Sequence, residues 1–240
     1  MLHFLFSNSH LYMKYKKISY GFLVSLMMTK CVVYHPQAID IPMICKKKDL
    51  KLDAGVSLIP SAHATISYGL TGKIAVQTFG SIGPDDRYYF QGAVGSFKNA
   101  GNQRVMEFYS GFGYGYGSSY IDANPGNLYG DYQLFFVQFN YGRINCEFAN
   151  TDYGFGLKTG YLHSDLTDHN YYDFYSVTGP FTTYQDNSLL MEPTVFVRLG
   201  GERLKFNIKL GGCWINKFTH RDKWIPYSFI NLGLGLTYKL

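Results

Sequence analysis

The sequence predicts an all-β fold: an antiparallel up-and-down transmembrane β-barrel of about ten strands, with eight or twelve strands also compatible. First, apolar and polar residues alternate with a period of two in one segment after another, which is typical of strands with one apolar face. Second, aromatic residues make up 18% of the chain and charged residues only 16%, against a usual ~25% charged. Third, no run of about 18 apolar residues occurs beyond the N-terminus, which argues against a helical membrane protein.

Residues 1–30 are interpreted as an extension followed by a signal peptide. After Met13, three lysines form a basic region, and residues 18–28 form an apolar region of secretory-signal length. Cys31 then lies where a bacterial lipoprotein is cleaved and lipidated, so it is the candidate lipidation site. Lys30 departs from the small residue that signal peptidases prefer. An unmodified cysteine after an ordinary or uncleaved signal is therefore the alternative.

Residues 31–49 are predicted to be a periplasmic tether, because Pro36 and Pro42 interrupt a segment with little periodicity. The run 46–48 is basic, and a solvated or membrane-proximal position explains it better than nucleic acid does. The four cysteines of the chain show neither CxxC nor metal-ligand spacing. We therefore expect no metal and no cofactor.

Residues 50–240 are predicted to form the outer-membrane β-barrel, because turn signals separate their alternating segments. The ten expected strands lie at 50–58, 62–70, 73–82, 87–98, 104–119, 131–142, 153–161, 189–199, 203–214 and 230–240. Short turns are expected at 70–73, 99–103 and 200–203, and longer loops at 118–130 and 164–188. Outer-membrane barrels have short periplasmic turns and long extracellular loops, which places both chain ends on the periplasmic side.

The polar faces of these strands carry charges of both signs. The positions predicted to point into the lumen are Lys51, Asp53, Glu107, Lys158, Glu192, Arg198, Lys205 and Lys209. A ten-stranded barrel is closer to the small barrels filled by side chains than to porins of about 16–18 strands. We therefore expect these side chains to pair with one another and to leave no wide pore.

Several motifs are shared with a known family. Cys31 is followed by a segment containing Tyr34, Pro36 and Pro42, then by "KKKDLKLDAGVS" and the glycine-aromatic "GFGYGYG". In these features the chain resembles the small outer-membrane β-barrel lipoproteins of Gram-negative bacteria. The last strand resembles the signal read by the barrel-assembly machinery, although Leu240 stands where an aromatic residue is typical; the matching positions are Asn231, Gly233, Leu236 and Tyr238. The resemblance implies location in the bacterial outer membrane, with outer-membrane lipid, lipopolysaccharide and the assembly machinery as partners, and no nucleic acid.

The segment "LHSDLTDHN" places His163, Ser164, Asp165, Asp168 and His169 around the start of the longest expected loop. A catalytic histidine needs an orienting carboxylate and a nearby nucleophile or activated water, and adjacency in a loop does not supply that geometry. A solvated loop is the favoured interpretation, ahead of an ion or ligand contact and of catalysis. Aromatic residues farther along are interpreted first as an interfacial girdle and second as a surface for a partner or glycan: Tyr171, Tyr172, Phe174, Tyr175, Phe181 and Tyr184.

These observations predict a non-enzymatic outer-membrane barrel with a structural or surface-binding role. A narrow channel or transporter for small solutes is one alternative, and an outer-membrane enzyme centred on residues 163–169 is another. A secreted calycin-like barrel holding an apolar ligand is the third. It would require Leu204, Phe206 and Leu210 to point inward while Lys205 and Lys209 face water.

Overall fold

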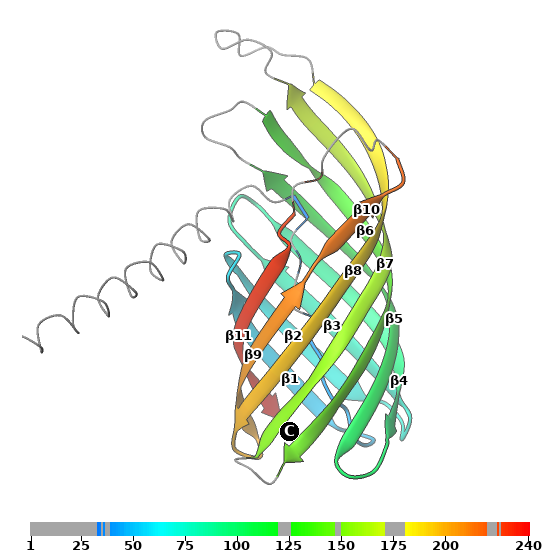
Figure 1. Cartoon of the computed structure of the whole chain (residues 1–240), viewed down its shortest axis with the longest axis vertical. Helices are drawn as coiled ribbons and strands as arrows, with labels where there is room; N and C mark the ends of the chain where they lie inside the picture. Colours follow the sequence, from blue (N-terminus) through cyan, green and yellow to red (C-terminus); the bar gives the residue numbers. More distant parts are fainter. Residues whose placement is uncertain are drawn as a thin grey trace, which may run out of the picture.

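The computed structural model describes residues 33, 34, 36, 39–119, 126–146, 150–170, 181–219, 225 and 227–240, and these form an all-β structure (Figure 1). The strands are β1 (Leu50–Ser57), β2 (Ser61–Gly69), β3 (Ile74–Ile82), β4 (Tyr88–Asn99), β5 (Arg104–Ser119), β6 (Gly126–Cys146), β7 (Thr151–Asn170), β8 (Phe181–Gly200), β9 (Leu204–Gly212), β10 (Trp214–Lys217) and β11 (Ile230–Lys239). Within the described residues, no helix is long and apolar enough to cross a membrane.

The strands close into a ring in which each one pairs antiparallel with the next. β10 continues β9 after an interruption at Cys213, and both pair with β8, so they count as one strand of the wall. β11 closes the ring by pairing with β9 on one side and β1 on the other, where Leu52 lies opposite Tyr238. The predicted ten-stranded, up-and-down antiparallel barrel is therefore confirmed.

The alternation in the sequence sorts side chains between the outside of the wall and the lumen. In β9, Leu204 and Leu210 are 51% and 50% exposed on the outside, whereas Lys205 and Lys209 are buried on the inside. In β11, Leu234, Leu236 and Tyr238 face outward. This arrangement contradicts the calycin-like alternative, because it requires the opposite orientation of β9.

Strands β6, β7 and β8 are 21, 20 and 20 residues long and rise above the rest of the wall (Figure 1). The expected loops at 118–130 and 164–188 are therefore wrong in extent, because β5 reaches Ser119, β7 reaches Asn170 and β8 begins at Phe181. The outer face becomes polar in this extension, as at the exposed Asp165, whereas the buried inner face mixes apolar residues such as Leu162 and Leu166 with the polar Ser164. Because the outer face is no longer apolar here, the period-two signal is lost, and the sequence therefore predicts a loop for these strand segments.

The ring has two unlike mouths. The short-turn mouth contains the β2–β3, β4–β5 and β8–β9 turns and the C-terminus, and the long-strand mouth contains the ends of β6–β8 (Figure 1). Asp49 lies at the short-turn mouth, where Gly69 donates its N–H to the Asp49 carbonyl at 2.9 Å. Val33, the first described residue, packs beside Gly117 near the opposite mouth. The two ends of the barrel segment lie together at the short-turn mouth, where Leu240 donates its N–H to the Leu50 carbonyl at 3.0 Å. The residues before Val33 lie outside the described part of the chain, so the side on which the N-terminus lies stays a prediction.

Candidate functional site: a lumen filled by the N-terminal strap

The described residues between 33 and 49, here called the lumen strap, run through the barrel from one mouth to the other. Val33, Tyr34, Ile39, Ile41, Met43 and Ile44 are all buried inside the wall. The prediction of a periplasmic tether is thus wrong for these residues. Residues 39–44 of the strap combine apolar side chains with one acid, Asp40, and burying the apolar surface favours the interior over water.

Side chains of the wall satisfy the backbone of the strap. The Ile44 N–H donates to Glu107 Oε1 at 2.6 Å, and Arg198 Nη2 donates to the Ile41 carbonyl at 2.6 Å. The amides of Gln77 and Gln138 both donate to the Asp40 carbonyl, at 3.2 and 3.0 Å. A buried strap outside any sheet needs such partners, because an unpaired backbone group away from water is costly. The wall therefore holds this segment much as a groove holds an extended peptide.

Asp40 lies at the centre of a buried ionic cluster. Its Oδ1 is 3.0 Å from Lys209 Nζ and 3.5 Å from Arg198 Nη2. Lys209 also pairs with Asp53 at 2.8 Å, and Asp53 accepts hydrogen bonds from Asn207 and Thr237, both at 2.6 Å. Removing one member of a buried ion network leaves an uncompensated charge in a medium that solvates it poorly. The strap and the wall are therefore joined electrostatically at this level.

Nearer the long-strand mouth, the strap packs against an apolar and aromatic layer. Tyr34 forms a parallel bridge with Tyr227, and its ring lies 5.2 Å from that of Tyr132 in an edge-to-face arrangement. Its hydroxyl donates to Glu192 Oε1 at 3.1 Å, and Glu192 also pairs with Lys158 at 3.6 Å. A Cβ at position 117 would overlap the Val33 carbonyl oxygen, so only glycine admits the strap here.

The structure places all eight predicted lumen residues inside the barrel. They are buried to 7% exposure or less: Lys51, Asp53, Glu107, Lys158, Glu192, Arg198, Lys205 and Lys209. They do not simply pair with one another, because Asp40 of the strap and Asp152 of β7 complete the network; Asp152 lies 2.6 Å from Lys205. The eight residues comprise five cations but only three carboxylates, and this excess of positive charge indicates that further acidic residues lie in the lumen.

The other predicted residues are placed as follows. Asn231 points inward and donates to the Pro36 carbonyl, Gly233 faces the lumen, and Leu236 and Tyr238 lie on the outer face of β11. Their recognition by an assembly machinery stays a prediction. Cys31, the candidate lipidation site, lies outside the described residues.

The residues considered for catalysis lie on strand β7 rather than in a loop. His163 points outward, where Nδ1 is 2.7 Å from Asn187 Oδ1 and Nε2 is 3.8 Å from Asp165 Oδ2. Ser164 is buried on the opposite face of the strand, so it cannot serve His163 as a nucleophile. Asp168 and His169 lie farther along β7. Within the described part of the chain, no group of three His, Cys, Asp or Glu residues is arranged to hold a metal ion.

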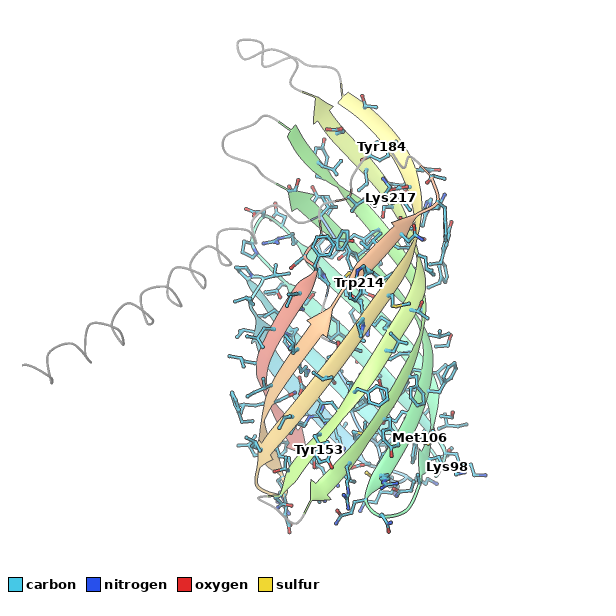
Figure 2. The ribbon with its side chains drawn as sticks, in the orientation of Figure 1. Lys98, Met106, Tyr153, Tyr184, Trp214 and Lys217 are labelled. Atoms are coloured by element: carbon cyan, nitrogen blue, oxygen red, sulfur yellow. The ribbon has the colours of Figure 1, made fainter. Side chains whose placement is uncertain are left out.

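The predicted aromatic girdle is only partly visible. Tyr171, Tyr172, Phe174 and Tyr175 lie outside the described residues, and Phe181 is the first residue of β8. Tyr184 is buried in the lumen, so its assignment to a girdle is wrong (Figure 2). Exposed aromatic side chains instead occur along the outer wall from one mouth to the other: Tyr88, Phe112, Tyr114, Phe135, Tyr161 and Trp214, and toward the short-turn mouth Phe108, Tyr153, Phe206 and Tyr238. Tyr114 also donates to Asp131 Oδ1 at 2.6 Å, with its apolar ring below a polar partner.

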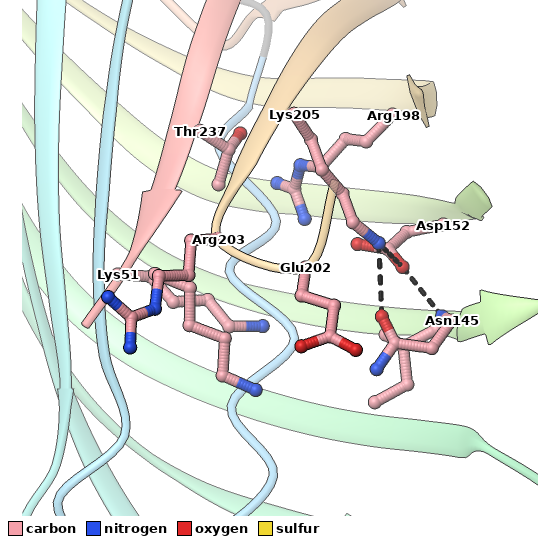
Figure 3. Close-up of a pocket in the computed structure, with 10 residues that line it drawn as sticks. Lys51, Asn145, Asp152, Arg198, Glu202, Arg203, Lys205 and Thr237 are labelled. Carbon is pink, nitrogen blue, oxygen red and sulfur yellow. Dashed lines mark hydrogen bonds and ion pairs between the residues drawn. The ribbon is translucent and has the colours of Figure 1, made fainter. Parts of the chain in front are cut away.

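A small hollow with a charged lining and a cavity volume of about 20 Å³ opens at the short-turn mouth (Figure 3). Five cationic side chains line it: Lys51, Arg198, Arg203, Lys205 and Lys239. Two acids, Asp152 and Glu202, complete the charged lining, together with Asn145. Lys205 Nζ donates to Asn145 Oδ1 at 3.0 Å as well as pairing with Asp152. Sequence analysis missed this hollow, because its residues come from both ends of the barrel segment and from the β6–β7 region.

Comparison with known proteins supports the fold assignment. No protein-family model and no curated protein matches the sequence. The structure is similar to that of the outer membrane protease OmpT from Escherichia coli, with a TM-score of 0.53 and 11% identity, covering 81% of this chain and 94% of that one. The N-terminal β-barrel domain of Pseudomonas aeruginosa OprF matches with a TM-score of 0.34, 10% identity and coverages of 81% and 98%. The KdgM porin in complex with disordered oligogalacturonate matches with a TM-score of 0.34 and 11% identity, covering 80% of this chain and 99% of that one.

The fold defines the class of protein. The chain is a small β-barrel of the outer-membrane type, closed by ten antiparallel strands. At 11% identity the similarity to OmpT concerns the fold alone. The fold suggests a bacterial outer membrane location.

Proposed function

We propose that the chain is a non-enzymatic, non-conducting barrel of the bacterial outer membrane, with a structural or surface-binding role. The observation that carries this proposal is the lumen strap, whose side chains and backbone occupy the space that a solute would have to cross. A polar lumen of charged side chains could otherwise favour a narrow channel. Here those charges are engaged with the strap, with Asp152 and with one another.

The absence of enzymatic activity is part of the proposal. β7 places His163 and Ser164 on opposite faces and leaves the His163–Asp165 pair on the exposed outer face, which argues against catalysis. A surface-binding role draws on the extension of β6–β8, which projects beyond the wall with polar groups outside. Short turns in outer-membrane barrels face the periplasm, so this extension would face the cell exterior.

Fractionation, gel mobility and planar-bilayer recording of the same preparation test the proposal. We expect the chain expressed from Met13 to be recovered in the outer membrane and to change mobility on boiling. We expect no ion-conducting steps from the folded protein. Steady conductance of the intact chain would contradict a filled lumen. Loss of a lipid- or peptide-cleaving activity in His163→Ala would contradict the absence of catalysis.

A further inference from the structure

We propose that the hollow at the short-turn mouth binds a small oxyanion, of the class of inorganic phosphate and short carboxylates. The hollow combines an excess of cationic side chains with an opening at the mouth (Figure 3). The strap and the wall use part of this positive charge. The positive charge that neither the strap nor the wall neutralises indicates an anionic ligand.

Arg198 is the central donor of the proposed site. It is 1% exposed, and Nη2 is engaged by the Ile41 carbonyl and Asp40. Nε and Nη1 have no hydrogen-bond partner among the described residues. A guanidinium carries five N–H donors in a planar fork that matches the oxygens of a carboxylate or phosphate. A buried arginine with unused donors beside a hollow therefore calls for an acceptor.

The other cations are only partly neutralised. Lys51 Nζ donates to the neutral carbonyl of Met43. Lys239 lies 3.8 Å from Asp49 and is partly exposed, and Arg203 is exposed on the β8–β9 turn. Among these cations, Lys205 has the nearest carboxylate partner, Asp152 at 2.6 Å. An oxyanion entering the hollow would meet several donors that have no full counter-charge in place.

Glu202 indicates that the hollow accepts a carboxylate or a similar oxyanion. Figure 3 shows its carboxylate reaching from the turn between the Lys51 side and the Lys205–Asp152 side of the hollow. Glu202 is exposed and belongs to the β8–β9 turn, where Gly200 ends β8 and Gly201 follows it. Its carboxylate would therefore act as an internal competitor that an external oxyanion must displace. Ordered water is the alternative occupant of such a polar space.

Phosphate binding to the refolded full-length barrel in detergent tests the inference, with chloride at matched ionic strength as the reference. We expect saturable binding of inorganic phosphate and a rise in the unfolding midpoint, since a ligand specific for the native state stabilises it. The double variant Arg203→Gln, Lys239→Gln should bind about tenfold more weakly, because charge-assisted hydrogen bonds are lost. Glu202→Gln should bind about threefold more tightly, because the competing charge is removed.

The control is Lys98→Gln, which removes an exposed lysine at the end of β4, away from the hollow (Figure 2). Its phosphate affinity should equal that of the unaltered chain. An equal loss in Lys98→Gln and in the double variant would mean general charge screening and would overturn the proposal. No saturable binding, or weaker binding by Glu202→Gln, would also overturn it and would leave water as the occupant. Acetate in place of phosphate tells a carboxylate preference from a phosphate preference.

Discussion

The two halves of the lumen hold the same strap with different proportions of polar and apolar contact, although Ile41 and Met43 also pack in an apolar cluster on the short-turn side. Near the short-turn mouth, the wall presents charged and amide side chains that pair with Asp40 and with strap backbone groups. Near the long-strand mouth, the strap meets an apolar cluster that includes Tyr89, Tyr132 and Leu162. Polar contacts fix position through directed bonds, whereas apolar contacts contribute in proportion to buried area. Substitutions of polar partners near the short-turn mouth should therefore cause large losses in the free energy of unfolding. Substitutions near the long-strand mouth should cause smaller losses that scale with the buried area removed.

The largest effect is expected for Asp40→Ala. This change leaves Lys209 and Arg198 without a shared carboxylate in a buried site, and breaking a buried ion pair costs about 3–5 kcal/mol. Urea unfolding of the refolded barrel measures the loss. Asp165→Ala is the matched control, because it removes an exposed carboxylate paired with His163, worth about 0–1 kcal/mol. Equal destabilisation by both variants would mean that Asp40 is not buried in the lumen.

Gly117→Val should be next, at about 1–3 kcal/mol, the range for inserting side-chain atoms into a packed interior. The new Cβ would overlap the Val33 carbonyl oxygen and displace the upper end of the strap. Gly92→Ala is the control, because a Cβ at that position meets open space. The comparison uses thermal unfolding midpoints. A Gly117→Val protein as stable as Gly92→Ala would contradict the close approach of the strap.

Tyr34→Phe should cost about 1–2 kcal/mol, since it removes a hydrogen-bond donor from the buried Glu192 carboxylate and leaves the ring in place. Tyr238→Phe, on the outer face of β11, is the comparison and should be close to neutral. The denaturant concentrations at the unfolding midpoints show which of the two variants is less stable. A neutral Tyr34→Phe would show that the upper half holds the strap by apolar contact alone.

The smallest effect is expected in thiol labelling of Cys45, in a variant that retains this cysteine and no other. Burial raises the pKa of the Cys45 thiol, so less reactive thiolate is present at neutral pH than for a free thiol. The labelling rate should therefore be slow and should still be rising at pH values where a free cysteine has levelled off. Asp40→Ala in the same background should accelerate labelling by releasing the strap. An unchanged labelling rate would mean that the accessibility of Cys45 does not depend on the contacts of Asp40.

The contrast between the two halves also explains what sequence analysis could reach. Alternation predicted the wall, as at Leu204 and Lys205, because a barrel between lipid and a polar lumen repeats with period two. It could not predict the strap, because a segment bound through its backbone, such as 39–44, carries no periodic pattern. It also missed the upper halves of β7 and β8, where the outer face is polar and the inner face mixes Leu162 and Leu166 with polar residues. Asp40 was recognisable only from the excess of positive charge in the lumen.

The most direct test of the central claim is a disulfide between positions 34 and 227. These residues form a parallel bridge between the strap and the chain before β11, and neighbouring strands lie about 4.8 Å apart, within the range that a disulfide spans. In a background without native cysteines, Tyr34→Cys with Tyr227→Cys should cross-link under mild oxidation in intact outer membranes. Tyr34→Cys with Ser96→Cys, on the outer face near the other mouth, should not. Free thiols in the first pair, with Cys at position 34 open to periplasmic reagents, would place the strap outside the lumen and contradict the account.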